Sequence, residues 1–568
     1  MRPTLARWAT ILAAGAVLGC APSLDRAGSR PAPVGGEGIG DRAQTRPLQI
    51  GLVQEPGILG GKFGGGGTGI ADYEFLFGAR LVRYDHLGNP MAVLAREVPS
   101  LDNGSWRLID NGRMETTYRL RPGATWHDGL PFTSQDVVFT WQTIMNPELP
   151  AENREPEKYM ESIQTPDDHT VMVRWKEPYI FANAWDLVPT PRHILEPLVQ
   201  RDPQAFADAG YWTRDWVGMG PYRLTDWVQG SHLKGQGFRD YALGAPKIAE
   251  IVVYFVPDAN QGVARMLAGA IDLTLGNLIR LDEGLVLKEQ MEPRGEATIM
   301  AIPTKHRYGE FQYREPQPPP SRDVRVRQAM IHALDRNLLV ESLLHGLTTA
   351  ADVYLAPNDA AFAEADRAIR KYPYDRGRAA SLFQSAGWAP GPDGILRSPA
   401  GERFDFEVRT TEEVQNVKEA QILADFWRKV GINPSIEIIP RAKQNDQEYR
   451  AKFPGVSLSA TSIAPDWMDK WQTERIASDA NRWRGGNRGA YSRPELDRLY
   501  RDYITTIDPG KRQAALVTLV KFASEDMTYL PLYYQVDVHA IRTGLKGIVA
   551  RWPGQAGMAF NAHEWSWE

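Results

Sequence analysis

The chain has almost no cysteine, because Cys20 is the only one among its 568 residues. A single thiol cannot form an internal disulfide, so the fold does not depend on a disulfide framework. An unpaired thiol is reactive outside the cell, so a lone cysteine in an exported protein is expected to have a specific use.

The chain also lacks a basic excess and a second long apolar run. Its formal net charge is −5 and its pI is about 6.1, whereas a nucleic-acid partner would call for clustered Lys and Arg. After the first twenty residues no stretch reaches the roughly 20 apolar residues that cross a bilayer. We therefore expect no nucleic-acid partner and no transmembrane helix.

The common motifs of hydrolases are missing too. The sequence contains no Gly-x-Ser-x-Gly elbow and no His-Glu-x-x-His pair. Its ten histidines are scattered singly, and His306, next to Lys305, stands alone. We expect no enzyme, no metal site and no cofactor. Paired carboxylates cannot be recognised from one sequence, so a secreted glycoside hydrolase stays as an alternative.

The N-terminus has the pattern of an export signal. Arg2 and Arg7 precede a short apolar run, Trp8 to Leu18. The run ends in Val-Leu-Gly-Cys, which resembles a lipoprotein signal-peptidase site and predicts lipidation of Cys20. Residues 21–46 are rich in Pro, Gly, Ala and charge and predict a flexible tether. We expect a protein of the periplasm or cell surface, anchored to the membrane through Cys20.

The remaining chain of about 520 residues is too long for one core. Strand patterns such as 250–256 and 404–409 alternate with helix patterns such as 324–334, 376–386 and 414–430. A mixed α/β fold follows directly.

The stretch TTYRLRPGATWHDGLPFTSQDVVFTW, residues 116–141, is the most informative segment. Residues 116–120 alternate like a strand, and Gly123 and Gly129 supply positions for two tight turns. Thr133 or Ser134 can cap the following helix, with Asp136 in its first turn. We interpret this segment as scaffold.

The segment resembles a signature of the family 5 extracellular solute-binding proteins, which include the dipeptide and oligopeptide receptors of ABC importers. Similar blocks recur in order along the chain, at residues 218–230, 264–273, 324–346, 372–388 and 491–534. One departure is SATSIAPDWMDKW, residues 459–471, where the family often shows an Asp followed by Pro.

The resemblance implies a two-lobed periplasmic binding protein fold of the large, peptide-receptor type, with an extra subdomain in lobe I. The boundaries that it implies are a signal peptide at 1–20, a tether at 21–46, lobe I at 47–301 with its insertion at about 76–197, lobe II at 302–526, and a return to lobe I at 527–568. Strands near 300–304 and 530–535 would cross between the lobes and form a hinge.

Two segments would line the solute in a protein of this family. The glycine-rich loop 60–75 contains Gly66, Gly67, Thr68 and Tyr73, and its glycines allow close backbone approach. The second segment is a strand at 456–463, whose Ser462 and Ile463 precede a loop with two acids and two tryptophans. Receptors for peptides pair main chain with main chain at such positions.

The resemblance also assigns roles in that loop. Asp466 is the best match for the aspartate that pairs with a peptide's α-ammonium, Asp469 is second, and Trp467 and Trp471 would wall the cavity. A ligand carboxylate would call for an arginine, and the candidates Arg441, Arg475, Arg482 and Arg484 stay unranked.

The partners implied are a peptide, an ABC permease and its ATPase, with the receptor itself a monomer. Oligosaccharides, nickel complexes, haem or opines are alternative cargoes, because relatives take them up. A sensor or adhesion lipoprotein without a transporter is a further alternative.

Overall fold

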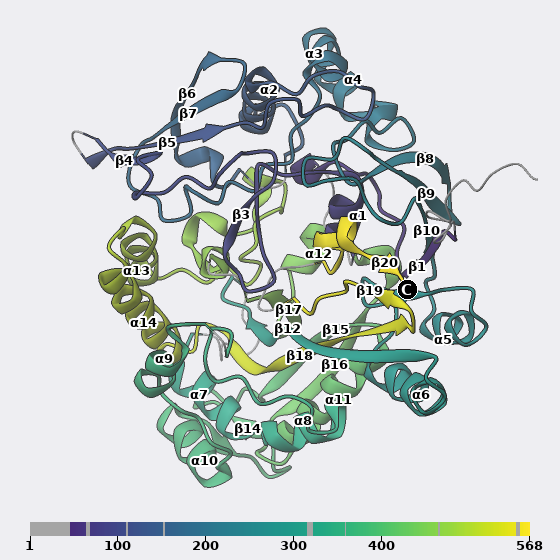
Figure 1. Cartoon of the computed structure of the whole chain (residues 1–568). Helices are drawn as coiled ribbons and strands as arrows, with labels where there is room; N and C mark the ends of the chain where they lie inside the picture. Colours follow the sequence, from purple (N-terminus) through teal and green to yellow (C-terminus); the bar gives the residue numbers. More distant parts are fainter. Residues whose placement is uncertain are drawn as a thin grey trace, which may run out of the picture. The chain divides into compact units, whose positions relative to one another are not determined.

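The computed structural model describes residues 46–63, 69–109, 112–151, 154–314, 322–357, 359–463, 466–551 and 557–568. All of these belong to one unit that spans residues 44–568 (Figure 1). Cys20, residues 21–45 of the tether predicted at 21–46, and Gly66, Gly67 and Thr68 of the glycine-rich loop lie outside the described residues.

A large mixed sheet runs through this unit, with parallel and antiparallel neighbours. Its strands in spatial order are β16 (Asn433–Ile439), β15 (Asp405–Thr411), β17 (Val456–Ser462), β12 (Ala297–Phe311), β18 (Leu530–Arg542), β11 (Leu273–Thr274), β1 (Leu48–Leu52), β10 (Glu250–Phe255), β9 (His232–Gly237) and β8 (Tyr222–Val228). The strands predicted at 250–256, 404–409 and 456–463 are confirmed within one or two residues at each end.

The two longest strands, β12 and β18, lie side by side in the middle of this sheet (Figure 1). They pair antiparallel from Ala297↔Arg542 to Gly309↔Leu530, with two register shifts. Each strand contributes fully buried apolar residues to the core, such as Phe311 of β12 and Leu532 of β18. Both strands are longer than the short crossovers expected from sequence, so they connect the strands on either side into one continuous sheet.

The signature segment folds as its residues predict. It supplies β5 (Met114–Arg119) and α2 (Ser134–Met145), and both Gly123 and Gly129 have a positive φ. Thr133 precedes α2 and donates its backbone N–H to the Asp136 carboxylate at 2.9 Å. Strand β5 belongs to a second sheet, whose order is β4 (Trp106–Leu108), β5, β7 (Thr170–Trp175) and β6 (Met160–Asp167).

Helices alternate with these strands along the chain. They are α1 (Ile70–Phe77), α2, α3 (Arg192–Arg201), α4 (Pro203–Ala207), α5 (Ala259–Leu267), α6 (Leu281–Met291), α7 (Val324–His332), α8 (Arg336–Leu344), α9 (Phe362–Ala368), α10 (Arg376–Ser385), α11 (Val414–Arg428), α12 (Gln447–Ala451), α13 (Pro494–Thr505) and α14 (Pro509–Glu525). Helix α11 packs on β15 and β16, and α6 packs on β12 and β18. The helices expected at 324–334, 376–386 and 414–430 are confirmed as α7, α10 and α11.

Short ribbons and single turns complete the unit. The ribbons pair β2 (Val82–Tyr84) with β3 (Pro90–Ala92), β13 (Ala389–Pro390) with β14 (Leu396–Arg397), and β19 (Leu545–Lys546) with β20 (Ser566–Trp567). Within the described ranges no helix combines the length and the apolar character that a bilayer crossing requires.

Candidate solute-binding site

A cavity of about 410 Å³ lies where β12, β17 and β18 meet the start of α1. Side chains of a strand alternate between its two faces, so residues spaced by two point the same way. Lys305 and Arg307 of β12 line the cavity at this spacing, and Gln535, Asp537 and His539 of β18 do so beside them. The long central strands therefore present a row of polar groups to one space.

Most charged side chains on the cavity wall formed by β12 and β18 are paired within the protein. Lys305 lies 3.5 Å from the Asp537 carboxylate, and the side-chain amide of Asn277 lies between them, donating to Asp537 and accepting from Lys305. Burial alone would raise the pKa of Asp537, but Lys305 and Thr304 hold it below its usual value. The pair fixes both side chains at the cavity wall.

Two arginines pair with acids of the α11 region. Arg280 pairs with the half-exposed Glu413, just before α11, and Arg307 pairs with Glu419 inside that helix. The Arg307 and Glu419 side chains are 6% and 0% exposed, so neither ion is shared with bulk water. Burial lowers the pKa of Arg307, but the charge of Glu419 raises it by more than burial lowers it. The pKa therefore lies above its usual value, and the guanidinium stays ionised.

The opposite wall comes from α1 and the C-terminal segment. Asp72 is buried and accepts a hydrogen bond from the backbone N–H of Ala559 at 2.9 Å. Burial raises its pKa despite that bond and the nearby charges of His539 and Arg551. Arg551 donates to the carbonyls of Gly557 and Tyr84, and burial together with other arginines lowers its pKa to about 9. This wall is therefore a desolvated polar surface.

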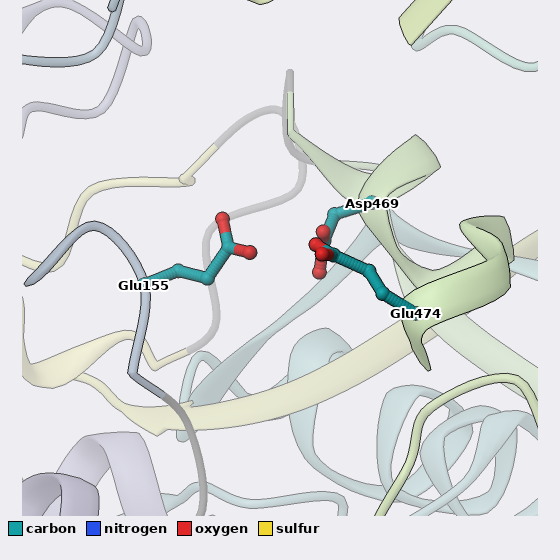
Figure 2. A group of neighbouring side chains, drawn as sticks. All are labelled: Glu155, Asp469 and Glu474. Atoms are coloured by element: carbon teal, nitrogen blue, oxygen red, sulfur yellow. The ribbon is translucent and has the colours of Figure 1, made fainter. Parts of the chain in front are cut away.

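A group of three carboxylates lies elsewhere, near the end of β17. Oxygens of Glu155, Asp469 and Glu474 all lie within 4.8 Å of one another, and Figure 2 shows Glu155 facing the other two. Lys158 pairs with both glutamates, and Arg475 lies 3.0 Å from Asp469. Burial and the Glu155 charge raise the pKa of Asp469 to about 7. The group is a salt-bridge network that joins segments more than 300 residues apart, and it is not assigned to a metal.

Asp466 lies beside this network, directly before the turn η7 (Trp467–Trp471). Its side chain is exposed, yet the protein around it raises its pKa to about 6, first by desolvation and then through the charges of Asp186 and Glu155. A side chain can be reached by water and still have protein atoms on most sides. A carboxylate held near other negative charges is stabilised by a positive ligand.

The tryptophans of this turn are packed into the core. Trp467 stacks on Tyr354 with ring centroids 5.6 Å apart, and Trp471 stacks on Tyr529 at 5.0 Å. They are 7% and 1% exposed. Neither indole N–H finds a hydrogen-bond partner in the described part of the chain.

The remaining predicted residues take different places. Ser462 lines the cavity, whereas Ile463 packs with Tyr534 in a small apolar cluster. Tyr73 is buried, and its hydroxyl donates to the carbonyl of Gln54 at 2.7 Å. The cavity-lining residues Asp72, Lys305, Arg450 and Asp537 were missed by the sequence reasoning. The two-residue spacing of polar groups on β12 and β18 is the signal that could have found Lys305 and Asp537.

The comparisons identify the fold and the family. A crystal structure of an oligopeptide-binding protein from Thermus thermophilus complexed with a pentapeptide matches with a TM-score of 0.78 and 25% identity, covering 92% of this chain and 97% of that one. The structure of NikZ from Campylobacter jejuni in complex with Ni(L-His) matches with a TM-score of 0.77 and 21% identity, covering 92% and 100%. This chain therefore has the two-lobed fold of periplasmic binding proteins.

Residues 98–479 match the model for bacterial extracellular solute-binding proteins, family 5, middle region. The oligopeptide-binding protein AppA of Bacillus subtilis is 25% identical over 522 residues, which cover 89% of this chain and 90% of that protein. This chain belongs to the family 5 extracellular solute-binding proteins. It is a binding protein of an extracellular family and not an enzyme.

Proposed function

We propose that this chain is the substrate-binding lipoprotein of an ABC importer, which captures di- or oligopeptides outside the cytoplasmic membrane and delivers them to a permease. Two similar proteins, AppA of B. subtilis and the T. thermophilus receptor, are described as oligopeptide-binding. An ATPase partner of the permease supplies the energy, and the receptor acts as a monomer that leaves its cargo unchanged.

The observation that carries the peptide assignment is the free edge of β17. This strand pairs with β12 along its whole length, but with β15 only at Val456 and Ser457. The stretch from Leu458 to Ser462 therefore has no strand partner on its outer side within the described residues, and four of its residues line the cavity. Such an edge offers backbone N–H and C=O groups to an added strand.

The tryptophans support a peptide over an oligosaccharide. A sugar would stack on an accessible indole face. Trp467 and Trp471 are buried and already stack on Tyr354 and Tyr529. They contribute to the packing behind the site, and a backbone edge with charged groups suits a peptide better.

The lobe boundaries belong to the same proposal. Lobe I comprises residues 47–301 with an insertion at about 76–197, lobe II residues 302–526, and the chain returns to lobe I at 527–568. Strands β12 and β18 would act as the hinge, since both contain a predicted crossover. The closed state must bind the solute better than the open state, and that difference drives closure.

The function is tested by titrating the purified protein with a peptide and with analogues that carry one backbone N-methyl group each. Removing one strand hydrogen bond should weaken binding about fivefold at alternate positions of the ligand. Isothermal titration calorimetry measures the change. Equal affinity for every analogue would show that the ligand does not bind along the β17 edge. If the protein bound an oligosaccharide and no peptide, the solute would be an oligosaccharide, which is the alternative cargo.

The membrane anchor is tested separately. We expect a radioactive fatty acid to label the wild-type protein in cells and to be absent from Cys20→Ser, because the lipid is attached through that thiol. Ser105→Ala is the matched control and should keep the label. Label that persists in Cys20→Ser would show that the lipid is not attached through Cys20.

A further inference from the structure

Two stretches that are far apart in the sequence meet at a contact outside the cavity. Residues 177–181 follow β7 in the insertion proposed for lobe I, and α13 belongs to the proposed lobe II. The backbone N–H of Ile180 donates to the carbonyl of Ile504 at 2.8 Å. These two residues are 6% and 3% exposed, so the hydrogen bond joins buried parts of both stretches. The proposed lobes therefore touch each other directly at this point.

Side chains extend this contact beyond the backbone hydrogen bond. The rings of Phe181 and Tyr503 meet edge to face, with centroids 6.3 Å apart. The carboxylate of Glu177 lies 2.5 Å from the guanidinium of Arg501. Ring packing and ion pairing each favour the arrangement in which the two stretches are together. The contact thus combines a hydrogen bond, an apolar pair and a charge pair.

The pattern of α13 explains how one helix takes part in two kinds of contact. Its apolar face packs on α14 and carries the buried residues Leu496, Leu499, Tyr500, Tyr503 and Ile504, which recur at helical spacing. Two arginines lie on its exposed side. Arg501 reaches across to the insertion, whereas Arg498 pairs with Glu495 and Asp502 of its own helix. Only one of these two neighbouring arginines therefore connects the stretches.

We propose that six residues form a clasp that holds the lobes closed and sets the affinity for every solute by the same factor: Glu177, Ile180, Phe181, Arg501, Tyr503 and Ile504. None of them is among the residues that line the cavity. A contact made only in the closed state shifts the protein towards closure, and the apparent dissociation constant is the intrinsic constant divided by the closed fraction. The proposal rests on the function proposed above and adds a determinant of affinity that the solute does not touch.

The ion pair is the most direct probe of the clasp. Burial and, as a smaller effect, the charge of Asp466 raise the pKa of Tyr503, so that ring lies near the site proposed for the ammonium. A change at Tyr503 would mix an effect on closure with an effect on the ligand. Glu177 and Arg501 can be exchanged for each other, which keeps the pair and reverses its direction.

The test measures a tetrapeptide and its N-acetylated form on the full-length protein by calorimetry and stopped-flow fluorescence. Arg501→Glu sets two carboxylates against each other and should weaken both peptides by the same factor, about fivefold, through faster dissociation. Glu177→Arg should do the same, and the double variant should bind like wild type. Arg498→Glu is the matched control, because that arginine is similarly exposed on the same helix, and it should leave both affinities unchanged.

A second readout follows closure without any solute. Spin labels on Gln135→Cys of α2 and Lys521→Cys of α14 report the distance between the lobes, in a Cys20→Ser background that has no other thiol. We expect the solute-free protein to populate the distance that peptide binding fills. Arg501→Glu should deplete this population, and the double variant should restore it. Pulsed electron paramagnetic resonance measures both distributions.

The outcomes separate the clasp from the function on which it rests. Losses that differ between the two peptides would show direct contact with the solute and refute the clasp. Wild-type affinity and distances in Arg501→Glu would refute it as well, as would a double variant that recovers neither. If wild type binds no peptide offered, the proposed function fails, and the solute-free distances alone then decide whether the clasp exists. Recovery in the double variant excludes misfolding as the cause of a loss.

Discussion

Replacing Glu419 by glutamine is expected to lower the free energy of unfolding by about 3–5 kcal/mol, because the change leaves the buried Arg307 without its counter-ion. Both side chains are withdrawn from water, and β12 and α11 are held together at this point. A protein of this size need not unfold in two states, so hydrogen exchange of amides in β12 and α11 is the appropriate measurement.

Glu413→Gln provides the matched control. Glu413 precedes the same helix and also pairs with an arginine, Arg280, but its side chain is 48% exposed. Exposed pairs contribute about 0–1 kcal/mol, so this variant should exchange almost like wild type. Similar losses in the two variants would contradict the role given to burial. Replacing Arg307 and Glu419 together by methionine and leucine should recover much of the lost protection.

Asp466→Asn is expected to weaken binding of a peptide with a free N-terminus by about 10- to 100-fold, the range of a charge-assisted hydrogen bond. The N-acetylated peptide should lose little, because it brings no ammonium to the site. The carboxylate lies near Asp186 and Glu155, so a cation at this point relieves repulsion as well as forming a contact. Calorimetry with the two peptides measures the difference.

The pH dependence gives the same prediction a second readout. The surroundings of Asp466 raise its pKa to about 6, and an ammonium binds only the ionised form. Affinity for the free-amine peptide should therefore be constant above about pH 7 and fall by up to about tenfold per pH unit below about pH 6. Asp425→Asn, an exposed control on α11, should leave both peptides unaffected. Equal losses for free and acetylated peptides would refute the ammonium role of Asp466.

Local chemistry in the sequence was sufficient to predict much of the fold. Thr133 and Asp136 form the expected helix start, and Gly123 and Gly129 take the positive φ that their turns require. These features depend on residues close in sequence. The length of β12 and β18 could not be read in the same way, because their pairing depends on contacts more than 200 residues apart.

The site was less predictable, because a side chain that lines a cavity resembles one that packs in a core. Trp467 and Trp471 were expected to wall the solute, and the structure places them in an aromatic cluster with Tyr354 and Tyr529. Their position relative to a bound solute stays a prediction. Arg450 could not be singled out among 65 basic residues, since its place in the lining of the cavity is a property of the folded chain.

Native mass spectrometry of the purified protein, before and after incubation with a peptide mixture, tests the central claim most directly. We expect bound species whose masses correspond to peptides, released with their lengths unchanged on denaturation. Release of an oligosaccharide alone, or shortening of the peptides during incubation, would contradict an account in which this chain binds peptides and does no chemistry on them.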